Sequence, residues 1–286
     1  MREESINKIH EYIKEMPCLN VSAGKVMEIC NNVKVDASQL NRLISLDPVL
    51  TGRLLQLHNS SFFGLGPHVT SLVRSVTMLG VNTVKNIACS GAVLAQLPEN
   101  KNINGMDMEV FWRHCMYVGV TARMLAVKQG IDPIFHEEYY IAGLLHDIGK
   151  VPLNAVFSAD YAQAATVAVS ENIPFPAVED GRFGINHCLT GAMIAGVWKI
   201  EAPVADVIIH HHNARTYTGE NKNILYTVAI ADYFSSLYDM GFAGGKTLEK
   251  PDPEVWEECN IGENAHEELE NSVRGEIENA HKFLKT

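Results

Sequence analysis

The chain has 286 residues, of which 47% are hydrophobic and 20% are charged, and its formal net charge is −11 at pH 7. This balance is typical of a globular protein with a buried core and excludes a chain that is disordered throughout. The acidic excess argues against a nonspecific grip on DNA, which requires a basic face, although a local cation could still hold a small phosphorylated ligand.

The N-terminus carries no targeting signal that the sequence reveals. Its first ten residues are polar and charged, and no apolar stretch of the signal-peptide kind follows them. No run approaches the ~18 apolar residues of a spanning helix. The six cysteines are scattered without a C-x-x-C pair, and most have apolar neighbours. We therefore expect a soluble, cytoplasmic protein without a membrane partner, with its cysteines as reduced core thiols.

Helical periodicity dominates the first hundred residues. Asp36 and Asp47 are predicted to be helix N-caps, and Pro48 suits the first position of a helix. Residues 61–67 contain two glycines and a proline and are predicted to form a loop. The apolar spacings of three and four predict helices over 3–16, 23–33, 36–46, 47–59, 71–80 and 82–97.

The polar segment 98–107, PENKNINGMD, is the best candidate for an internal boundary. We therefore divide the chain into an N-terminal helical subdomain, 1–100, and a second helical subdomain, 101–286. Residues 173–184 and 215–223 are predicted to be loops. The sequence shows no strong alternating strand pattern, so the expected fold class is all-α. The helices predicted for the second part span 108–129, 137–146, 158–171, 185–198, 203–212, 224–240 and 263–284.

Histidine and aspartate recur in the helices predicted for the second part. Neutral imidazoles and carboxylates form a nitrogen and oxygen ligand set that suits Zn, Mn, Fe or Ni. Adjacent helical residues point about 100° apart, so a neighbouring His and Asp can serve one cluster of two metals, with the carboxylate bridging both. The candidate ligands are His114, the pair His146 and Asp147, His187, the triplet His210, His211 and His212, and Asp232.

Each candidate also has a simpler explanation. His114 and His187 could each be a hydrogen-bonded core histidine, and Asp232 could be a buried acid paired with a cation or a cap. Consecutive helical residues cannot all face one point, so at most two of the histidines 210–212 are expected to be ligands. Burying an uncompensated Asp147 in an apolar helix is costly, and a metal is one way to compensate it.

The ordered series of candidates resembles the HD superfamily of metal-dependent phosphohydrolases. LLHDIGK, residues 144–150, is close to the form found in the HD-GYP group, whose members cleave cyclic dinucleotides. The N-terminal half, LISLDPVLTGRLLQLHNSSFFG followed by SLVRSVTMLGVNTVKNIA, is similar to the signature of the HDOD proteins. The C-terminal stretch 260–284 also resembles the HDOD end, so the likeness covers nearly the whole chain. The resemblance implies that the two helical subdomains form one HDOD module of bacterial signal transduction.

The resemblance also implies roles for individual residues. Asp147 would bridge two divalent transition metal ions, which could be Fe, Mn, Zn or Ni, and Lys150 would contact a phosphate, so these two residues are the candidate catalytic groups. The family's ligand set includes two adjacent histidines, and these match either the first two or the last two residues of the triplet 210–212. We assign His210 and His211 while the register stays open. The remaining ligands implied are His114, His146, His187 and Asp232.

The chain departs from both related groups. Many HDOD proteins have lost the metal ligands, whereas this chain keeps a candidate at every ligand position. The Gly-Tyr-Pro motif of the HD-GYP group is replaced by ARTYTGENKN, residues 214–223, which argues against cleavage of cyclic dinucleotides. The expected function is hydrolysis of a nucleotide or cyclic nucleotide phosphoester. The alternative is a non-catalytic module with a structural or vestigial metal site, whose N-terminal half binds a signalling protein.

Overall fold

The computed structural model describes residues 2–16, 25, 37–59, 72–79, 84, 106–198, 200–237 and 250–285. Every regular element in these ranges is helical, which confirms the all-α prediction. The predicted helices 23–33 and 82–97, the loop 61–67 and the boundary 98–107 fall almost entirely outside the described residues. The elements are α1 (Arg2–Glu15), α3 (Ala37–Ser45), α4 (Pro48–Asn59), α5 (Leu72–Leu79), α7 (Met108–Lys128), η1 (Pro133–Phe135), α8 (His136–Leu145), α9 (Lys150–Glu171), α10 (Phe175–Phe183), α11 (His187–Trp198), α12 (Ala202–His210), η2 (His211–Thr216), α13 (Lys222–Leu237), α14 (Pro253–Cys259) and α15 (Ala265–Lys285).

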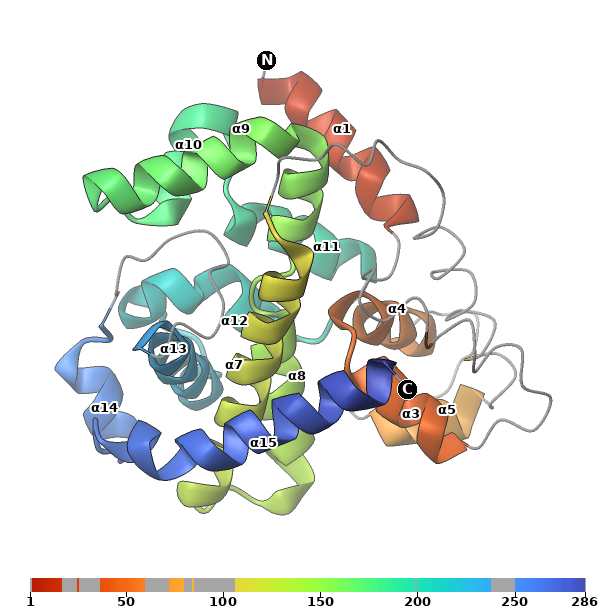
Figure 1. The fold of residues 1–286 in the computed structure, drawn as a ribbon, viewed down its shortest axis with the longest axis vertical. Coiled ribbons are helices and arrows are strands. Elements are labelled where there is room, and N and C mark those ends of the chain that lie inside the picture. Colours follow the sequence, from red (N-terminus) through yellow and green to blue (C-terminus); the bar gives the residue numbers. More distant parts are fainter. Residues whose placement is uncertain are drawn as a thin grey trace.

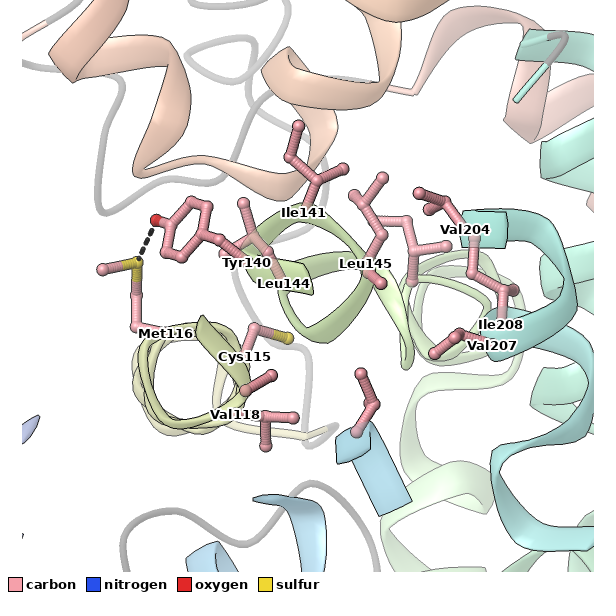
Figure 2. Packing of buried hydrophobic residues seen from close by; sticks show 14 of the residues in the cluster. Cys115, Met116, Val118, Tyr140, Ile141, Leu144, Leu145, Val204, Val207 and Ile208 are labelled. Carbon is pink, nitrogen blue, oxygen red and sulfur yellow. Dashed lines mark hydrogen bonds between the residues drawn. The ribbon is translucent and has the colours of Figure 1, made fainter. Parts of the chain in front are cut away.

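Helices α7 and α8 run side by side through the centre of the molecule (Figure 1). They approach closely because glycines face each other at the crossing: a Cβ atom added to Gly143 would lie 2.8 Å from the Cα atom of Gly119. Helix α8 in turn contacts α12 on its other side. Figure 2 shows the apolar side chains at these contacts, namely Cys115, Met116, Val118, Tyr140, Ile141, Leu144, Leu145, Val204, Val207 and Ile208.

The turn between α3 and α4 is tied to this central pair by two hydrogen bonds. The indole Nε1 of Trp112 in α7 donates to the carbonyl oxygen of Leu46 at 2.6 Å. The hydroxyl of Tyr140 in α8 donates to the carbonyl oxygen of Ser45 at 2.5 Å. Both acceptors are backbone groups, so the position of the turn is fixed relative to α7 and α8.

Asp47 begins α4 as an N-cap. Its Oδ1 atom accepts hydrogen bonds from the amides of Val49 at 2.9 Å and Leu50 at 3.1 Å. These amides have no partner within the helix, so the carboxylate satisfies two of the unpaired donors at its start. The prediction that Asp47 caps a helix is confirmed.

Residues 173–184 were predicted to be mostly loop, and this prediction is wrong, because they include α10. Pro176 lies in the first turn of the helix, where its missing N–H would have no partner in any case. The ring of Phe183 stacks on that of Phe157 in α9, with 4.4 Å between ring centroids. Packing against α9 therefore stabilises α10, although the prolines in this segment indicate a loop.

Helices α9 and α12 also have bounds that differ from those predicted, and α14 was not predicted. Helix α9 begins at Lys150 instead of residue 158, and it is bent at Ser158, where φ is 34°. Helix α12 ends at His210, and the next six residues form the 3-10 segment η2. The histidine triplet is therefore divided between two elements, which decides the orientation of its members.

The last helix, α15, packs on the body of the protein as its apolar face predicts. Val273 and Ile277 are buried. Arg123 of α7 donates to both carboxylate oxygens of Glu276, at 2.9 and 2.6 Å. In Figure 1 the helix crosses α7, which it contacts. Among the described helices, none combines the length and the apolar character needed to cross a membrane.

Candidate metal centre

Seven titratable side chains from five parts of the fold meet at one buried point. They surround the turn 146–149 that follows α8. The neighbouring elements that supply the other side chains are α7, α11, η2 and α13. The side chains are His114 from α7, His146 and Asp147 from the turn, His187 from the first position of α11, His211 and His212 from η2, and Asp232 from α13.

Asp147 lies at the middle of the group and is only 1% exposed. Its Oδ2 atom lies 3.2 Å from Nε2 of His114 and 3.3 Å from Nε2 of His146. Its Oδ1 atom lies 3.4 Å from Nε2 of His187 and 3.5 Å from Nε2 of His211. Each carboxylate oxygen therefore faces a different pair of histidines, which is the arrangement expected of a ligand that bridges two cations.

The first pair of histidines is completed by Asp232. Its Oδ1 atom lies 3.4 Å from Nε2 of His114 and 3.8 Å from Nε2 of His146, and the two Nε2 atoms are 3.2 Å apart. We call this group, together with Oδ2 of Asp147, site A. Its donor set is two nitrogens and two oxygens.

The second pair is completed by His212. Nε2 of His212 lies 3.0 Å from Nε2 of His187, and one ring nitrogen each of His187, His211 and His212 lie within 4.8 Å of one another. We call these three histidines, together with Oδ1 of Asp147, site B. Sites A and B share Asp147 as their common member.

His210 does not join the group. Its ring lies against that of Tyr217, with 5.2 Å between centroids. The backbone leaves the α-helical conformation at His210, where φ is −118° and ψ is 0°, so the ring of His210 is directed away from those of His211 and His212. Of the two registers that the sequence leaves open, the structure therefore brings His211 and His212 to the group and leaves the assigned His210 outside it.

Backbone carbonyls hold two of the rings so that Nε2 faces the site. Nδ1 of His146 donates to the carbonyl oxygen of Gly143 at 2.7 Å. Nδ1 of His211 donates to that of Val207 at 3.1 Å. A carbonyl can only accept, so each neutral ring carries its proton on Nδ1 and presents a lone pair at Nε2. This is the tautomer that binds a metal through Nε2.

A serine fixes His114 in the same way. The hydroxyl of Ser235 donates to the carbonyl oxygen of Asp232 at 2.8 Å. Its oxygen is then free to accept from Nδ1 of His114 at 3.0 Å. The ring of His114 therefore also presents the lone pair of Nε2 to Asp147 and Asp232.

Glu179 orients His187, a role that the sequence does not predict because residues 173–184 carry the signals of a loop. Its side chain is fully buried, and Oε2 accepts from both Nδ1 and the amide of His187, at 2.5 and 3.0 Å. Oε1 accepts from the hydroxyl of Tyr161 at 2.6 Å. Burial raises the pKa of Glu179 to about 7. A carboxylate hydrogen-bonded to a ligand histidine sets both its tautomer and its basicity.

Replacing Glu179 by alanine should weaken the binding of an ion at site B by about 10- to 100-fold, because His187 loses the partner that orients it. Competition with a chelator, followed by measurement of the metal content of the protein, would give this affinity. Tyr161→Phe, which removes only the other hydrogen bond to the carboxylate, is the matched control. Glu179→Gln keeps an acceptor oxygen and should recover part of the affinity. Equal site B affinities in all the variants would contradict an orienting role.

Lys150 lies inside the group and not at its surface. Its ammonium donates to Oδ2 of Asp147 at 2.6 Å and lies 5.6 Å from the centroid of the Phe175 ring. Burial alone would lower the pKa of Lys150, but the adjacent carboxylate outweighs this and raises it. Burial would likewise raise the pKa of Asp147, yet the adjacent ammonium of Lys150 holds it well below its usual range. Asp147 is therefore ionised and ready to act as a ligand.

The donor set fits a cation on its own chemistry. Within the described residues, Oδ1 of Asp147 and Nε2 of His211 are buried and have no hydrogen-bond partner. Both atoms are acceptors and they face each other at 3.5 Å. Leaving such atoms unsatisfied costs about 1–3 kcal/mol each, and a cation between them would satisfy both. Burial also lowers the pKa of His187 well below its ordinary value, which keeps that ring neutral.

A polar cavity of about 300 Å³ opens beside the group. His211, His212 and Asp232 form one part of its wall, and two cationic side chains, Arg215 and Lys250, form another. Lys150, for which a phosphate contact was predicted, does not line this cavity. An anionic ligand could enter beside the two exposed cations and reach the buried histidines.

Comparisons with known proteins agree with the fold. The family model of the HDOD domain matches residues 16–214. An uncharacterized protein of Treponema pallidum (strain Nichols) is 27% identical over 227 residues, which cover 78% of this chain and 43% of that protein. This chain therefore spans less than half the length of that relative.

Two solved structures are similar along nearly their whole length. The MmoQ response regulator from Methylococcus capsulatus str. Bath has a TM-score of 0.67 at 20% identity, covering 88% of this chain and 96% of that chain. An HDOD domain protein of unknown function from Geobacter sulfurreducens has a TM-score of 0.57 at 25% identity, covering 99% and 98%. These likenesses establish the fold.

Proposed function

The chain belongs to the HDOD domain family, and from this premise we propose that it is an HD-type signalling protein that binds two divalent metal ions and hydrolyses a phosphoester. The substrate class that we propose is a nucleotide or cyclic nucleotide. The observation that carries this proposal is the position of Asp147, whose two oxygens each face a separate pair of histidine Nε2 atoms.

The residues of sites A and B would hold the ions. Their imidazole and carboxylate donors suit Fe, Mn, Zn or Ni. When bound, two such ions would polarise a phosphoester and lower the pKa of an attacking water toward neutrality. The chain itself fixes the lone pairs of four of the five rings, because the Nδ1 atoms of His146, His211, His114 and His187 are engaged by Gly143, Val207, Ser235 and Glu179 respectively.

The charged side chains around the group favour an anionic substrate. Arg215 and Lys250 line the cavity beside site B, and each is paired with a carboxylate: Arg215 with Asp252 at 3.6 Å and Lys250 with Glu263 at 2.8 Å. Exposed pairs of this kind are weak, so a phosphate could replace the carboxylates at little cost. Lys150 supplies a further buried cation beside Asp147.

The test is hydrolysis by the metal-loaded protein of a panel that includes p-nitrophenyl phosphate, bis(p-nitrophenyl) phosphate, nucleoside monophosphates and cyclic mono- and dinucleotides. We expect two ions per chain and metal-dependent turnover of at least one compound, with turnover falling to the metal-free background in His146→Ala. His136→Ala is the matched control, since that ring is bonded to the carbonyl oxygen of Ile131 and lies outside sites A and B.

The outcomes separate the proposed enzyme from its alternative. Two bound ions without turnover of any compound would indicate a non-catalytic module with a structural metal, acting through a protein partner. Failure to bind ions at saturating concentrations of Mn²⁺, Fe²⁺ and Zn²⁺ would overturn the metal site and the hydrolase together.

A further inference from the structure

Cys188 is the residue after His187, in the first turn of α11, and it lies beside site B. Its Sγ atom and one ring nitrogen each of His187, His211 and His212 all lie within 4.8 Å of one another. The side chain is 7% exposed. The sequence predicts a reduced core thiol at this position, but the neighbours of Cys188 in space are potential metal ligands.

Cys188 differs from the other described cysteines in its surroundings. Cys115 and Cys259 belong to the apolar core, whereas Cys188 is buried outside that cluster. A cysteine that only fills space in the core does not require three imidazoles close to its sulfur. The alternative is that its sulfur is placed there as a donor atom.

An independent observation points to a ligand at the same place. Nε2 of His211 is buried without a hydrogen-bond partner, and it belongs to the same group of four donors as Cys188. His187 is fixed by Glu179 and His211 by Val207, so both rings hold their lone pairs toward the space that the sulfur borders. The group therefore combines a fixed set of nitrogens with one sulfur.

We propose that Cys188 is a sulfur ligand of site B, so that this site selects Zn²⁺ or Fe²⁺ over Mn²⁺. The inference rests on the proposed dinuclear centre and deepens it. Thiolate donors favour zinc and iron, whereas carboxylates also suit manganese. Site A has only nitrogen and oxygen donors, so its preference for Zn²⁺ or Fe²⁺ over Mn²⁺ is weaker, and the two halves of the centre differ in the ions they retain. The thiol proton is released to solvent when the sulfur binds the ion.

Cobalt titration of the metal-free protein tests this assignment without any measurement of activity. Co²⁺ bound by histidine and carboxylate absorbs in the visible, and a bound thiolate adds a charge-transfer band in the near ultraviolet. We expect both signals in the wild-type protein. The near-ultraviolet band should be lost in Cys188→Ser and kept in Cys259→Ser, the matched buried cysteine of the apolar core. The preference for Zn²⁺ over Mn²⁺ at one ion per chain should fall at least tenfold in Cys188→Ser.

A second measurement needs no variant. X-ray absorption at the zinc edge of the wild-type protein should show a sulfur neighbour at about 2.3 Å. Visible cobalt bands without a near-ultraviolet band, or zinc spectra without sulfur, would overturn the role of Cys188 and leave the dinuclear site standing. Absence of any cobalt spectrum would overturn the proposed metal centre itself.

Discussion

Replacing Asp147 by asparagine should remove both ions at once, lowering the metal content from two ions per chain to nearly none. The carboxylate is the only group that belongs to both sites, since Oδ2 faces site A and Oδ1 faces site B. An amide keeps the shape but loses the charge, and its NH₂ group repels a cation. Elemental analysis after dialysis against a limiting concentration of metal would measure the effect.

Two single-site variants provide the comparison for Asp147→Asn. Asp232→Asn should lose only the ion of site A, and His212→Ala only the ion of site B. Because Asp147→Asn leaves the buried ammonium of Lys150 without its partner, we expect it to destabilise the fold by about 3–5 kcal/mol. The double variant Asp147→Asn/Lys150→Met removes that charge and should recover stability without recovering metal. A single ion retained by the double variant would show that Asp147 is not shared.

Gly149→Ala should destabilise the protein by about 3 kcal/mol or more, at the upper end of what overpacking costs. A Cβ atom added to Gly149 would lie 2.0 Å from the carbonyl oxygen of His187 and 2.6 Å from the amide nitrogen of Gly191. Both are backbone atoms that cannot turn aside, so α11 would have to move. The φ angle of Gly149 is −64°, hence the requirement is for space and not for an unusual conformation.

Urea unfolding of the metal-free protein would measure this loss, with Gly196→Ala as the matched control. Gly196 lies in α11 as well, but a Cβ atom there would meet nothing within 4 Å. The control should be neutral or more stable by up to about 1 kcal/mol, because alanine favours helix over glycine. Equal unfolding midpoints for the two variants would show that α11 is not packed against the turn as described.

The order of histidines and aspartates along the chain predicted the candidate ligands because each lies in an apolar helical segment, where an unpaired polar group is costly. Asp47 was predicted as a cap for a local reason, the Asp-Pro pair at a helix start. Such features depend on neighbours in sequence, and the all-α class followed from the same kind of local periodicity.

Features that depend on tertiary packing could not be predicted in this way. The end of α12 at His210 decides which two histidines face the site, and no local signal marks it. Glu179 becomes a partner of His187 only because α10 forms and packs on α9. Cys188 gains its role from histidines 23 and 24 residues further along the chain, at positions 211 and 212.

The hydrogen bonds from Trp112 and Tyr140 to the turn between α3 and α4 link the N-terminal helices to the two helices that carry or precede His114 and His146. A protein that displaced this turn on docking would have to break or re-form bonds on both helices. Thermodynamic linkage then requires reciprocity: if docking changes the affinity for an ion by some factor, loading of the ion changes the affinity for the docked protein by that same factor. A protein that docked in this way would therefore sense the metal content of the chain.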